Sequence, residues 1–361
     1  MFQSVNFEEI IEQDKDKCIV ILACPNYEER SIYCLSKMLS LADDHMTNIK
    51  PEILFLKGRK NNNYVLEELK TQYSNNLKTK LSKSNIMINN CWHKIDYPSG
   101  YNSRGLVTRI TDKLKGYSKN NDISIHIDIS SMPKFIIFNL CEALSSWMDD
   151  DNIRIKEAYF SYVSPKQYSQ LPYAQEIGLL RGFFSSQPIS VENQQDVRAI
   201  IIPSMTGHEG KLLLDELNQI AYEQRNAIFL PILAKDILTS LEIMRANQII
   251  TEHDDSTQYY YCSIMDAIDL LSDYLSKEER ERIKYSPDSK RLYLVAPFGS
   301  KIMLPVSYFL LKKIKEENKN IDIEICDAQG FQYTSVYSIG IGEVNTFSLE
   351  INDNADKNKN M

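Results

Sequence analysis

The chain has 361 residues, of which 43% are hydrophobic and 25% are charged, so it carries enough apolar material for more than one globular core. Its formal net charge of −8 argues against a broad surface for duplex nucleic acid, because neutralising phosphates requires clustered Lys and Arg. No stretch approaches the roughly 18 uninterrupted apolar residues of a membrane-spanning helix, so we expect no membrane partner.

The seven cysteines are scattered along the chain and lie mostly within apolar runs. They form no C-x-x-C pair and no cluster with histidine, so we expect neither a metal site nor a cofactor. Buried, reduced thiols favour a cytoplasmic location. The acidic stretch 1–17 lacks the positively charged and apolar regions of a secretory signal.

Strand and helix patterns alternate through the first half of the chain. Residues 18–24 form a continuous apolar run, typical of a strand buried on both faces, and apolar positions at helical spacing follow over 31–42. This alternation predicts an α/β sheet with helices on both faces for residues 1–163. The further expected strands are 51–58, 84–96, 123–130 and 153–163, and the further expected helices are 65–73, 105–117 and 133–148.

Residues 164–197 break the alternation with a mixture of Pro, Ser and Gln, which indicates a connecting segment. The pattern then restarts, so we predict a second Rossmann-like unit over 198–350, with a disordered polar tail at 351–361. The expected strands are 198–205, 226–233, 291–297 and 321–328, and an amphipathic pattern covers 259–275.

The restart repeats a local pattern from the first half. Residues 125–138 (IHIDISSMPKFIIF) and 292–305 (LYLVAPFGSKIMLP) each contain an apolar run, a short turn, a lysine and a second apolar run. Residues 20–31 and 200–211 also align, each with an apolar run followed by a turn. Two explanations stay open: a divergent internal duplication, or two unrelated α/β units that share common strand-turn-helix signals.

The repeated turn has a composition that suits an anion. A parallel strand that enters a helix through a tight turn presents backbone N–H groups at the positive end of the helix dipole. The turn residues that we predict to bind a ligand are Ser130, Ser131 and Lys134 in the first unit, and Gly299, Ser300 and Lys301 in the second. The alternative is that serine and proline only cap a helix whose lysine is solvated. Neither turn matches a P-loop or the G-x-G-x-x-G pattern of dinucleotide-binding domains.

The turn after the first strand lies at the same expected sheet edge and adds three candidates. Tyr27 is suited to stacking on a base and Arg30 to contacting a phosphate, with Asn26 beside them. The alternative is that acidic residues of this turn simply occupy a helix N-terminus.

The equivalent turn of the second unit contains Thr206, a ligand-binding candidate, and the pair His208 and Glu209. This pair is the candidate for acid–base catalysis, and the alternative is that the histidine is a solvated or capping residue.

Residues 125–144 and 292–311 resemble the motif of the CRISPR-associated Rossmann fold (CARF) family, in which a strand leads through a small-residue turn to a lysine at a helix start. Lys134 and Lys301 match that lysine. In that family two such domains face each other across a two-fold axis and bind a cyclic oligonucleotide messenger. The resemblance therefore implies that one chain with two copies forms the pocket by itself.

The turn itself departs from the family pattern. Two glycines are usual there, whereas this chain has Ser131-Met132-Pro133 in one copy and Phe298-Gly299 in the other. The departure leaves the identity of the ligand open.

The sequence therefore favours a nucleotide-binding or nucleotide-sensing protein, with a phosphorylated small molecule or nucleotide as its ligand. The resemblance implies a cyclic oligonucleotide messenger in prokaryotic defence, with output through a protein effector partner. Two alternatives stay open: a metal-independent phosphodiesterase or nucleotide hydrolase that uses the same pocket, and a non-catalytic adaptor subunit.

Overall fold

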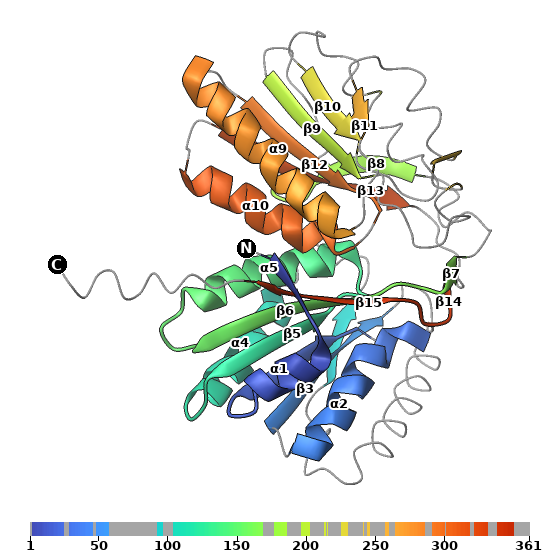
Figure 1. Ribbon diagram of the computed structural model, residues 1–361. Helices are drawn as coiled ribbons and strands as arrows, with labels where there is room; N and C mark the ends of the chain where they lie inside the picture. The colour runs from blue at the N-terminus through green and yellow to red at the C-terminus, as the bar shows by residue number, and fades with distance from the viewer. Residues whose placement is uncertain are drawn as a thin grey trace, which may run out of the picture. The chain divides into compact units, whose positions relative to one another are not determined.

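The chain folds into two compact units, and each is described here by itself. In the computed structural model the first unit comprises residues 1–169 and 335–361, and the second comprises residues 170–334 (Figure 1). The residues that the structure describes are 2–24, 29–45, 48–57, 92–96, 104–168, 177–185, 196–202, 213, 215, 225–229, 241, 244–245, 257–259, 264–285, 291–299, 301–317, 321–330 and 338–349. Among them, no helix has the length and apolar character needed to cross a bilayer.

The first unit is built on a sheet with the strand order β1-β15-β6-β5-β2-β3-β4. Its strands are β1 (Phe2–Val5), β2 (Cys18–Ala23), β3 (Asn48–Lys57), β4 (Trp92–Asp96), β5 (Ile123–Asp128), β6 (Ile155–Val163) and β15 (Val344–Leu349). The strands from β6 to β4 are parallel, and β15 runs antiparallel between β6 and β1. Every residue of β2 and β5 is buried, as expected of central parallel strands that are covered on both faces. A small separate pair is formed by β7 (Gln167–Tyr168) and β14 (Ser338–Ile339).

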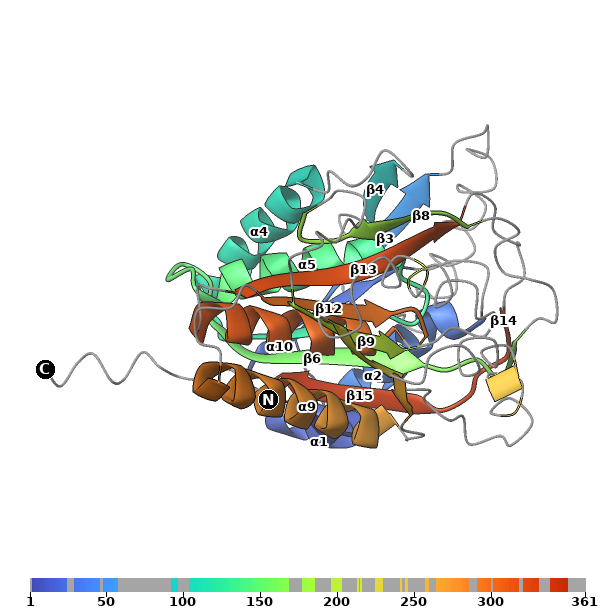
Figure 2. The ribbon, with the colours of Figure 1, turned by 90° about the horizontal axis from the view of Figure 1, so that it is seen from above.

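Helices cover both faces of this sheet. On one face lie α1 (Phe7–Gln13) and α2 (Tyr33–His45), which pack with Ile19, Ile21 and Tyr159 of the strands in one core cluster. Successive side chains of a strand point to opposite faces, so Val20 and Leu22 of β2 face the other layer. That layer contains α4 (Arg104–Ser118) and α5 (Lys134–Met148), which lie side by side (Figure 2).

The acidic stretch 1–17, to which the sequence analysis assigned no element, contains β1 and α1. Asn6 caps α1: its side chain accepts the backbone N–H of Glu9 at 2.8 Å, and the Glu9 carboxylate accepts the N–H of Asn6. This is a capping box, a signal that can be read directly from sequence as Asn followed three residues later by Glu.

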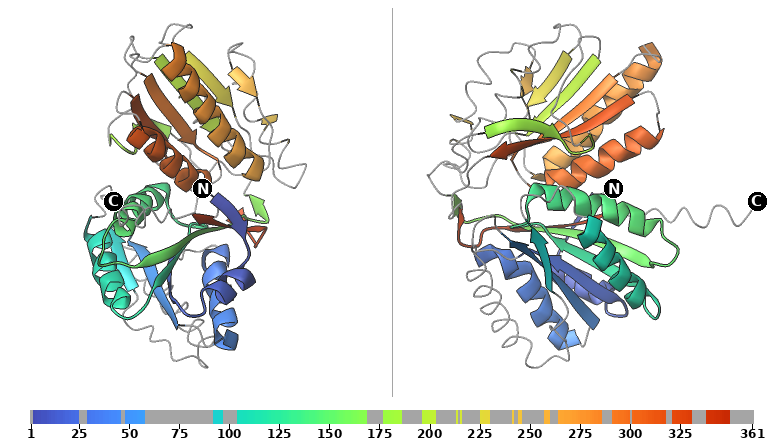
Figure 3. Two further views of the ribbon diagram at one scale, coloured as in Figure 1. Left: turned by 60° about the vertical axis from the view of Figure 1, so that its left-hand side comes forward. Right: turned by 180° about the vertical axis from the view of Figure 1, so that it is seen from behind.

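The second unit is built on a sheet with the strand order β11-β10-β9-β12-β13-β8. Its strands are β8 (Ile177–Gly182), β9 (Asp196–Ile202), β10 (Arg225–Phe229), β11 (Thr257–Tyr259), β12 (Arg291–Pro297) and β13 (Ile321–Gly330). All pairs are parallel except that of β13 with β8. Two helices, α9 (Ile264–Tyr285) and α10 (Met303–Glu317), contact each other over one face of the sheet (Figure 3).

The two sheets share one topology. Read from β4, the first sheet runs β4-β3-β2-β5-β6 and then meets the antiparallel strand β15; the second runs β11-β10-β9-β12-β13 and then meets the antiparallel strand β8. The predicted fold class, α/β with two Rossmann-like units and mainly parallel sheets, is confirmed. The shared strand order is the arrangement that an internal duplication predicts.

The antiparallel strands β8 and β15 belong to other parts of the fold than the expected unit boundaries assigned to them. Strand β15 falls within the expected second unit, 198–350, yet it pairs with β6 of the first sheet. Strand β8 falls within the expected connection, 164–197, yet it pairs with β13. In each sheet this strand covers the edge of the last parallel strand, which would otherwise expose unpaired backbone groups. The expected helix at 65–73 and the tail at 351–361 lie outside the described residues.

A buried carboxylate in the second unit generates a stability prediction. Glu324 accepts the backbone N–H groups of Phe184 and Ser185 at 2.8 and 3.0 Å, and a Cβ atom at Gly182 would overlap its carboxylate. We expect Gly182→Ala to lower the free energy of unfolding by about 1–3 kcal/mol, because the new methyl group must displace Glu324 from both bonds.

The matched control is Gly116→Ala on an exposed turn of α4, where a Cβ atom meets open space. Alanine is the better helix former, so this variant should gain up to about 1 kcal/mol. Denaturant unfolding of both variants measures the difference, and equal stabilities would contradict the steric argument.

Candidate functional site

The turns that were singled out from the sequence lie at the topological switch point of each sheet. From β2 the next parallel strand, β3, lies on one side, whereas from β5 the next parallel strand, β6, lies on the other. The connections that leave the carboxyl ends of the neighbouring strands β2 and β5 therefore diverge. Open α/β sheets bind their ligands at such a divergence. In the second unit, β9 and β12 have the same relation.

In the first unit the turn after β5 is tied to both neighbouring strands. The backbone N–H and the hydroxyl of Ser130 donate to Oδ1 of Asp128 at 3.0 and 2.5 Å, and the N–H of Val163, at the end of β6, donates to the Ser130 hydroxyl at 2.9 Å. The Ser131 hydroxyl donates to the backbone carbonyl of Cys24, just after β2, at 2.5 Å. Both serines are buried, and their hydroxyls shape the turn; a direct ligand contact by either stays a prediction.

Arg30 belongs to the short 3-10 helix η1 (Glu29–Ile32), which follows β2. It is 2% exposed, and its Nη1 donates to the carbonyl of Val163 at 2.8 Å. Its guanidinium carbon lies 5.9 Å from the centre of the Tyr162 ring. The side chain therefore joins the segment after β2 to the end of β6, and the phosphate contact that we expected of it stays a prediction.

Asp128 is a buried carboxyl group at the centre of these contacts. Burial raises its pKa to about 6, while hydrogen bonds from Ser130 and Cys34 and the charge of Arg30 act in the opposite direction. The Cys34 thiol of α2 is itself buried, and burial together with the charge of Asp128 raises its pKa well above the ordinary value. Such a thiol is a poor nucleophile at neutral pH, so the structure gives it no catalytic role.

The turn delivers Lys134 to the first position of α5. Pro133 precedes it with extended backbone angles, φ −61° and ψ 144°, and no side chain caps the helix. The first turn of α5 contains no acidic residue. A cation therefore stands at the positive end of a helix of 15 residues, where an acidic residue or a bound anion is favoured.

The second unit places a lysine in the same position relative to its sheet. The N–H of Gly299, just after β12, donates to the carbonyl of Ile202 at the end of β9 at 3.0 Å. Lys301 follows, and its carbonyl accepts the N–H of Leu304 in the first turn of α10. Backbone atoms thus make the link between neighbouring strand ends that the Ser131 hydroxyl makes in the first unit.

The other predicted site residues lie outside the described residues, and their roles stay predictions: Asn26, Tyr27, Thr206, His208, Glu209 and Ser300. Within the described part of the chain, no group of three or more His, Cys, Asp or Glu side chains is placed to hold a metal ion.

Asp128 was not among the predicted site residues, although the sequence contains a signal for it. Residues 123–130 (ISIHIDIS) alternate strictly between isoleucine and a polar residue, which usually indicates a half-exposed strand. Here every one of these residues is buried. Polar side chains at every second position of a fully buried strand indicate a buried polar cluster.

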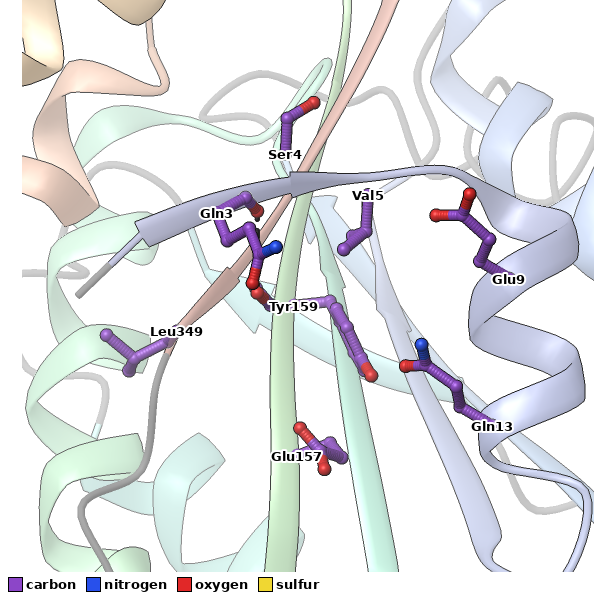
Figure 4. Close-up of a pocket in the computed structure, with 9 residues that line it drawn as sticks. Gln3, Ser4, Val5, Glu9, Gln13, Glu157, Tyr159 and Leu349 are labelled. Carbon is purple, nitrogen blue, oxygen red and sulfur yellow. Dashed lines mark hydrogen bonds between the residues drawn. The ribbon is translucent and has the colours of Figure 1, made fainter.

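A pocket of about 250 Å³ lies elsewhere in the first unit, beside β1, α1, β6 and β15 (Figure 4). Tyr159 lies at its centre with the hydroxyl directed toward Gln13. Two carboxylates line it, but Glu9 is engaged in the cap of α1 and Glu157 lies 3.5 Å from the Lys17 ammonium. None of the predicted site residues lines this pocket, and we assign it no ligand.

No family model matches the chain, and no curated protein matches it. Two solved structures illustrate its similarities. A universal stress protein from Archaeoglobus fulgidus is 12% identical, with 86% of this chain and 97% of that chain covered and a TM-score of 0.23. A protein from Listeria monocytogenes, provisionally named a UDP-N-acetylglucosamine 2-epimerase, is 8% identical, with 84% and 89% covered and a TM-score of 0.18. Both TM-scores are low, and no conclusion rests on either likeness.

The raised pKa of Asp128 predicts a pH dependence of stability. The folded protein holds this proton up to about pH 6, whereas the unfolded chain releases it near 3.8. The contribution of Asp128 to stability is therefore complete below pH 3.8 and is lost as the pH rises through about 6. We expect the free energy of unfolding of the wild type, measured relative to Asp128→Asn, to fall over this window and to stay level above it.

Denaturant unfolding at a series of pH values measures this difference. The control is Asp151→Asn, which removes an exposed carboxylate that takes no part in the contacts of Asp128. A pH-independent difference for Asp128→Asn would contradict the prediction.

Proposed function

We propose that this protein binds a nucleotide or a related phosphorylated ligand at the carboxyl edge of its sheets, with the phosphate at the N-terminus of α5. One observation carries the proposal: Lys134 is the first residue of an uncapped helix that starts at the switch point of the first sheet. Switch point, helix N-terminus and lysine each favour an anionic ligand, and here they coincide.

The electrostatics support this proposal. A lysine in the first turn of a helix meets the positive end of the dipole, which costs stability unless an anion compensates. A phosphate bound there accepts backbone N–H groups and a charge-assisted bond from the ammonium group together. The turn before α5 is held by buried hydrogen bonds, so little ordering is needed when the ligand arrives.

The second unit supports the same reading, because Lys301 precedes α10 at the equivalent switch point. Each unit therefore presents a lysine-bearing turn at its own switch point. The more specific form of the proposal is a sensor for a cyclic oligonucleotide messenger in prokaryotic defence, acting through a protein effector in the cytoplasm. That form rests on the CARF resemblance of the two lysine-bearing turns.

The proposal predicts that both lysines contribute to affinity. A charge-assisted hydrogen bond is worth about 1.5–3 kcal/mol, so Lys134→Ala or Lys301→Ala should weaken binding by roughly 10- to 150-fold. Calorimetric titration of nucleotides and cyclic oligonucleotides measures the affinities, and melting temperatures recorded in parallel should change little.

Lys156→Ala is the matched control, since this exposed lysine lies near the amino end of β6, at the opposite edge of the first sheet. Its affinity should equal that of the wild type. Equal affinities for all four proteins would exclude the two turns as the site. If no phosphorylated compound binds the wild type, the adaptor alternative becomes the better account.

A further inference from the structure

A column of buried polar side chains runs along one face of β5. Ser124, His126, Asp128 and Ser130 alternate with isoleucines, and each of the four is at most 3% exposed. The His126 ring stacks on Tyr159 of β6, with ring centres 4.5 Å apart, and Asp128 lies against Cys34 of α2. The column therefore lies between the sheet and the layer of α1 and α2.

The lower end of the column, at Ser124, is a continuous set of hydrogen bonds. Ser124 donates its hydroxyl proton to Oδ2 of Asp14, which follows α1, and the Ser124 oxygen lies 3.2 Å from Nε2 of His126. Lys17 donates to the other carboxylate oxygen of Asp14 at 2.7 Å. Since the Ser124 proton points to Asp14, the serine oxygen is left to accept, and Nε2 of His126 must carry the hydrogen.

The upper end of the column, at Ser130, joins the switch-point turn through the bonds from Ser130 to Oδ1 of Asp128. Between the two ends the column is interrupted at two atoms. Among the residues that the structure describes, neither Nδ1 of His126 nor Oδ2 of Asp128 has a hydrogen-bond partner, and both atoms are buried. Residues two apart on one strand have Cα atoms roughly 6.6 Å apart and side chains on the same face, so a single water can contact both side chains.

We propose that one buried water molecule joins Nδ1 of His126 to Oδ2 of Asp128, so that β5 carries an unbroken hydrogen-bonded chain from Asp14 to the switch-point turn. Buried polar atoms without partners are rare in native proteins, and internal waters are their usual partners. The Cys34 thiol is a weak donor to Asp128 and leaves Oδ2 without a partner.

A water fits both protonation states of Asp128. When Asp128 is protonated, its Oδ2–H donates to the water, the water donates to Nδ1 of His126, and Nε2–H donates to Ser124. When Asp128 is ionised, the water donates one hydrogen to each side. A single proton is thus stored at the upper end of the column, and it can leave without any other group having to change its charge.

The charged groups around the column are consistent with this assignment. Burial lowers the pKa of His126, although Asp14 opposes this effect, so burial favours the neutral imidazole. Burial acts to raise the pKa of Asp14, but hydrogen bonds from His126, Lys17 and Ser124 outweigh it, so Asp14 stays ionised.

Around Asp128 stand Arg30 from η1 and Cys34 from α2; Tyr159 faces His126, and burial raises the pKa of its hydroxyl. Asp128 is therefore the group in the column that changes charge near pH 6.

A crystal structure of the full chain tests the water directly. Density for one water within hydrogen-bond distance of both Nδ1 of His126 and Oδ2 of Asp128 is the expected result. A direct contact between the two side chains, or a space between them without a water, would overturn the proposal.

NMR of the imidazole nitrogens gives a second test, and its first part, the tautomer of His126, uses a wild-type chain at Asp128. His126, assigned through the loss of its signals in His126→Gln, should be the neutral Nε2–H tautomer at neutral pH, and its signals should show an inflection at about pH 6. In Asp128→Asn the inflection should be absent, and in the control Asp151→Asn it should be unchanged. An Nδ1–H tautomer, ionisation of His126 itself, or an inflection that persists in Asp128→Asn would each contradict the proposal.

A further prediction, which rests on the proposed function, links the protonation of Asp128 to ligand binding. An anion at the start of α5 disfavours the charged form of Asp128, so binding should take up a proton. Titration of AMP at pH 6.5 in two buffers of different ionisation enthalpy measures this uptake, which should vanish in Asp128→Asn. Binding of AMP without uptake would remove the link and leave the proposed function standing. If AMP does not bind, the proposed function loses support, while the structure and NMR still decide on the water.

Discussion

The hydrogen bonds of Ser130 fix where β5 ends and where α5 begins. Its hydroxyl donates to Asp128 of its own strand and accepts the N–H of Val163 at the end of β6, while Arg30 binds the Val163 carbonyl from the other side of the switch point. These contacts are buried, so they operate at low dielectric, where each is strong and where the loss of one partner is costly. The position of Lys134 relative to the first sheet depends on these hydrogen bonds.

The two units reach the same arrangement with different chemistry. In the first, a side chain links the turn to the neighbouring strand, as the Ser131 hydroxyl binds the carbonyl of Cys24; in the second, the N–H of Gly299 binds the carbonyl of Ile202. What the units share is a lysine beside that link, at the first position of α5 in one unit and two residues before α10 in the other. A feature that is kept while its supporting contacts differ is better explained by a common task than by the needs of folding alone.

Much of the fold could be predicted from sequence because the central strands are continuous apolar runs. Strands β2, β12 and β13 were expected where they occur, since burial on both faces requires such runs. The antiparallel strands β8 and β15 were missed because their pairing depends on contacts between segments far apart in the chain, which local patterns do not encode. The helix α1 carried a readable capping box in Asn6 and Glu9 that we did not use.

The candidate site was only partly predictable. The lysine-bearing turns follow from local composition, but the role of Asp128 does not, because the alternation in 123–130 looks like that of a strand with one wet face. Only the layer formed by α1 and α2 turns that face into a buried one. His126 and Asp128, which the pattern would place at the surface, are therefore buried in a column of polar side chains, and burial raises the pKa of the Asp128 carboxyl group.

The central claim is that the start of α5 is where a ligand binds, and amide hydrogen exchange followed by mass spectrometry tests it most directly. The full chain would be compared with and without mononucleotides and cyclic oligonucleotides. A phosphate at this helix N-terminus would hold the amides of the turn and of the first helical residues, so exchange over residues 129–137 should slow when a ligand is added. Unchanged exchange in this segment, together with protection elsewhere in the chain, would place the ligand at another site and contradict the account.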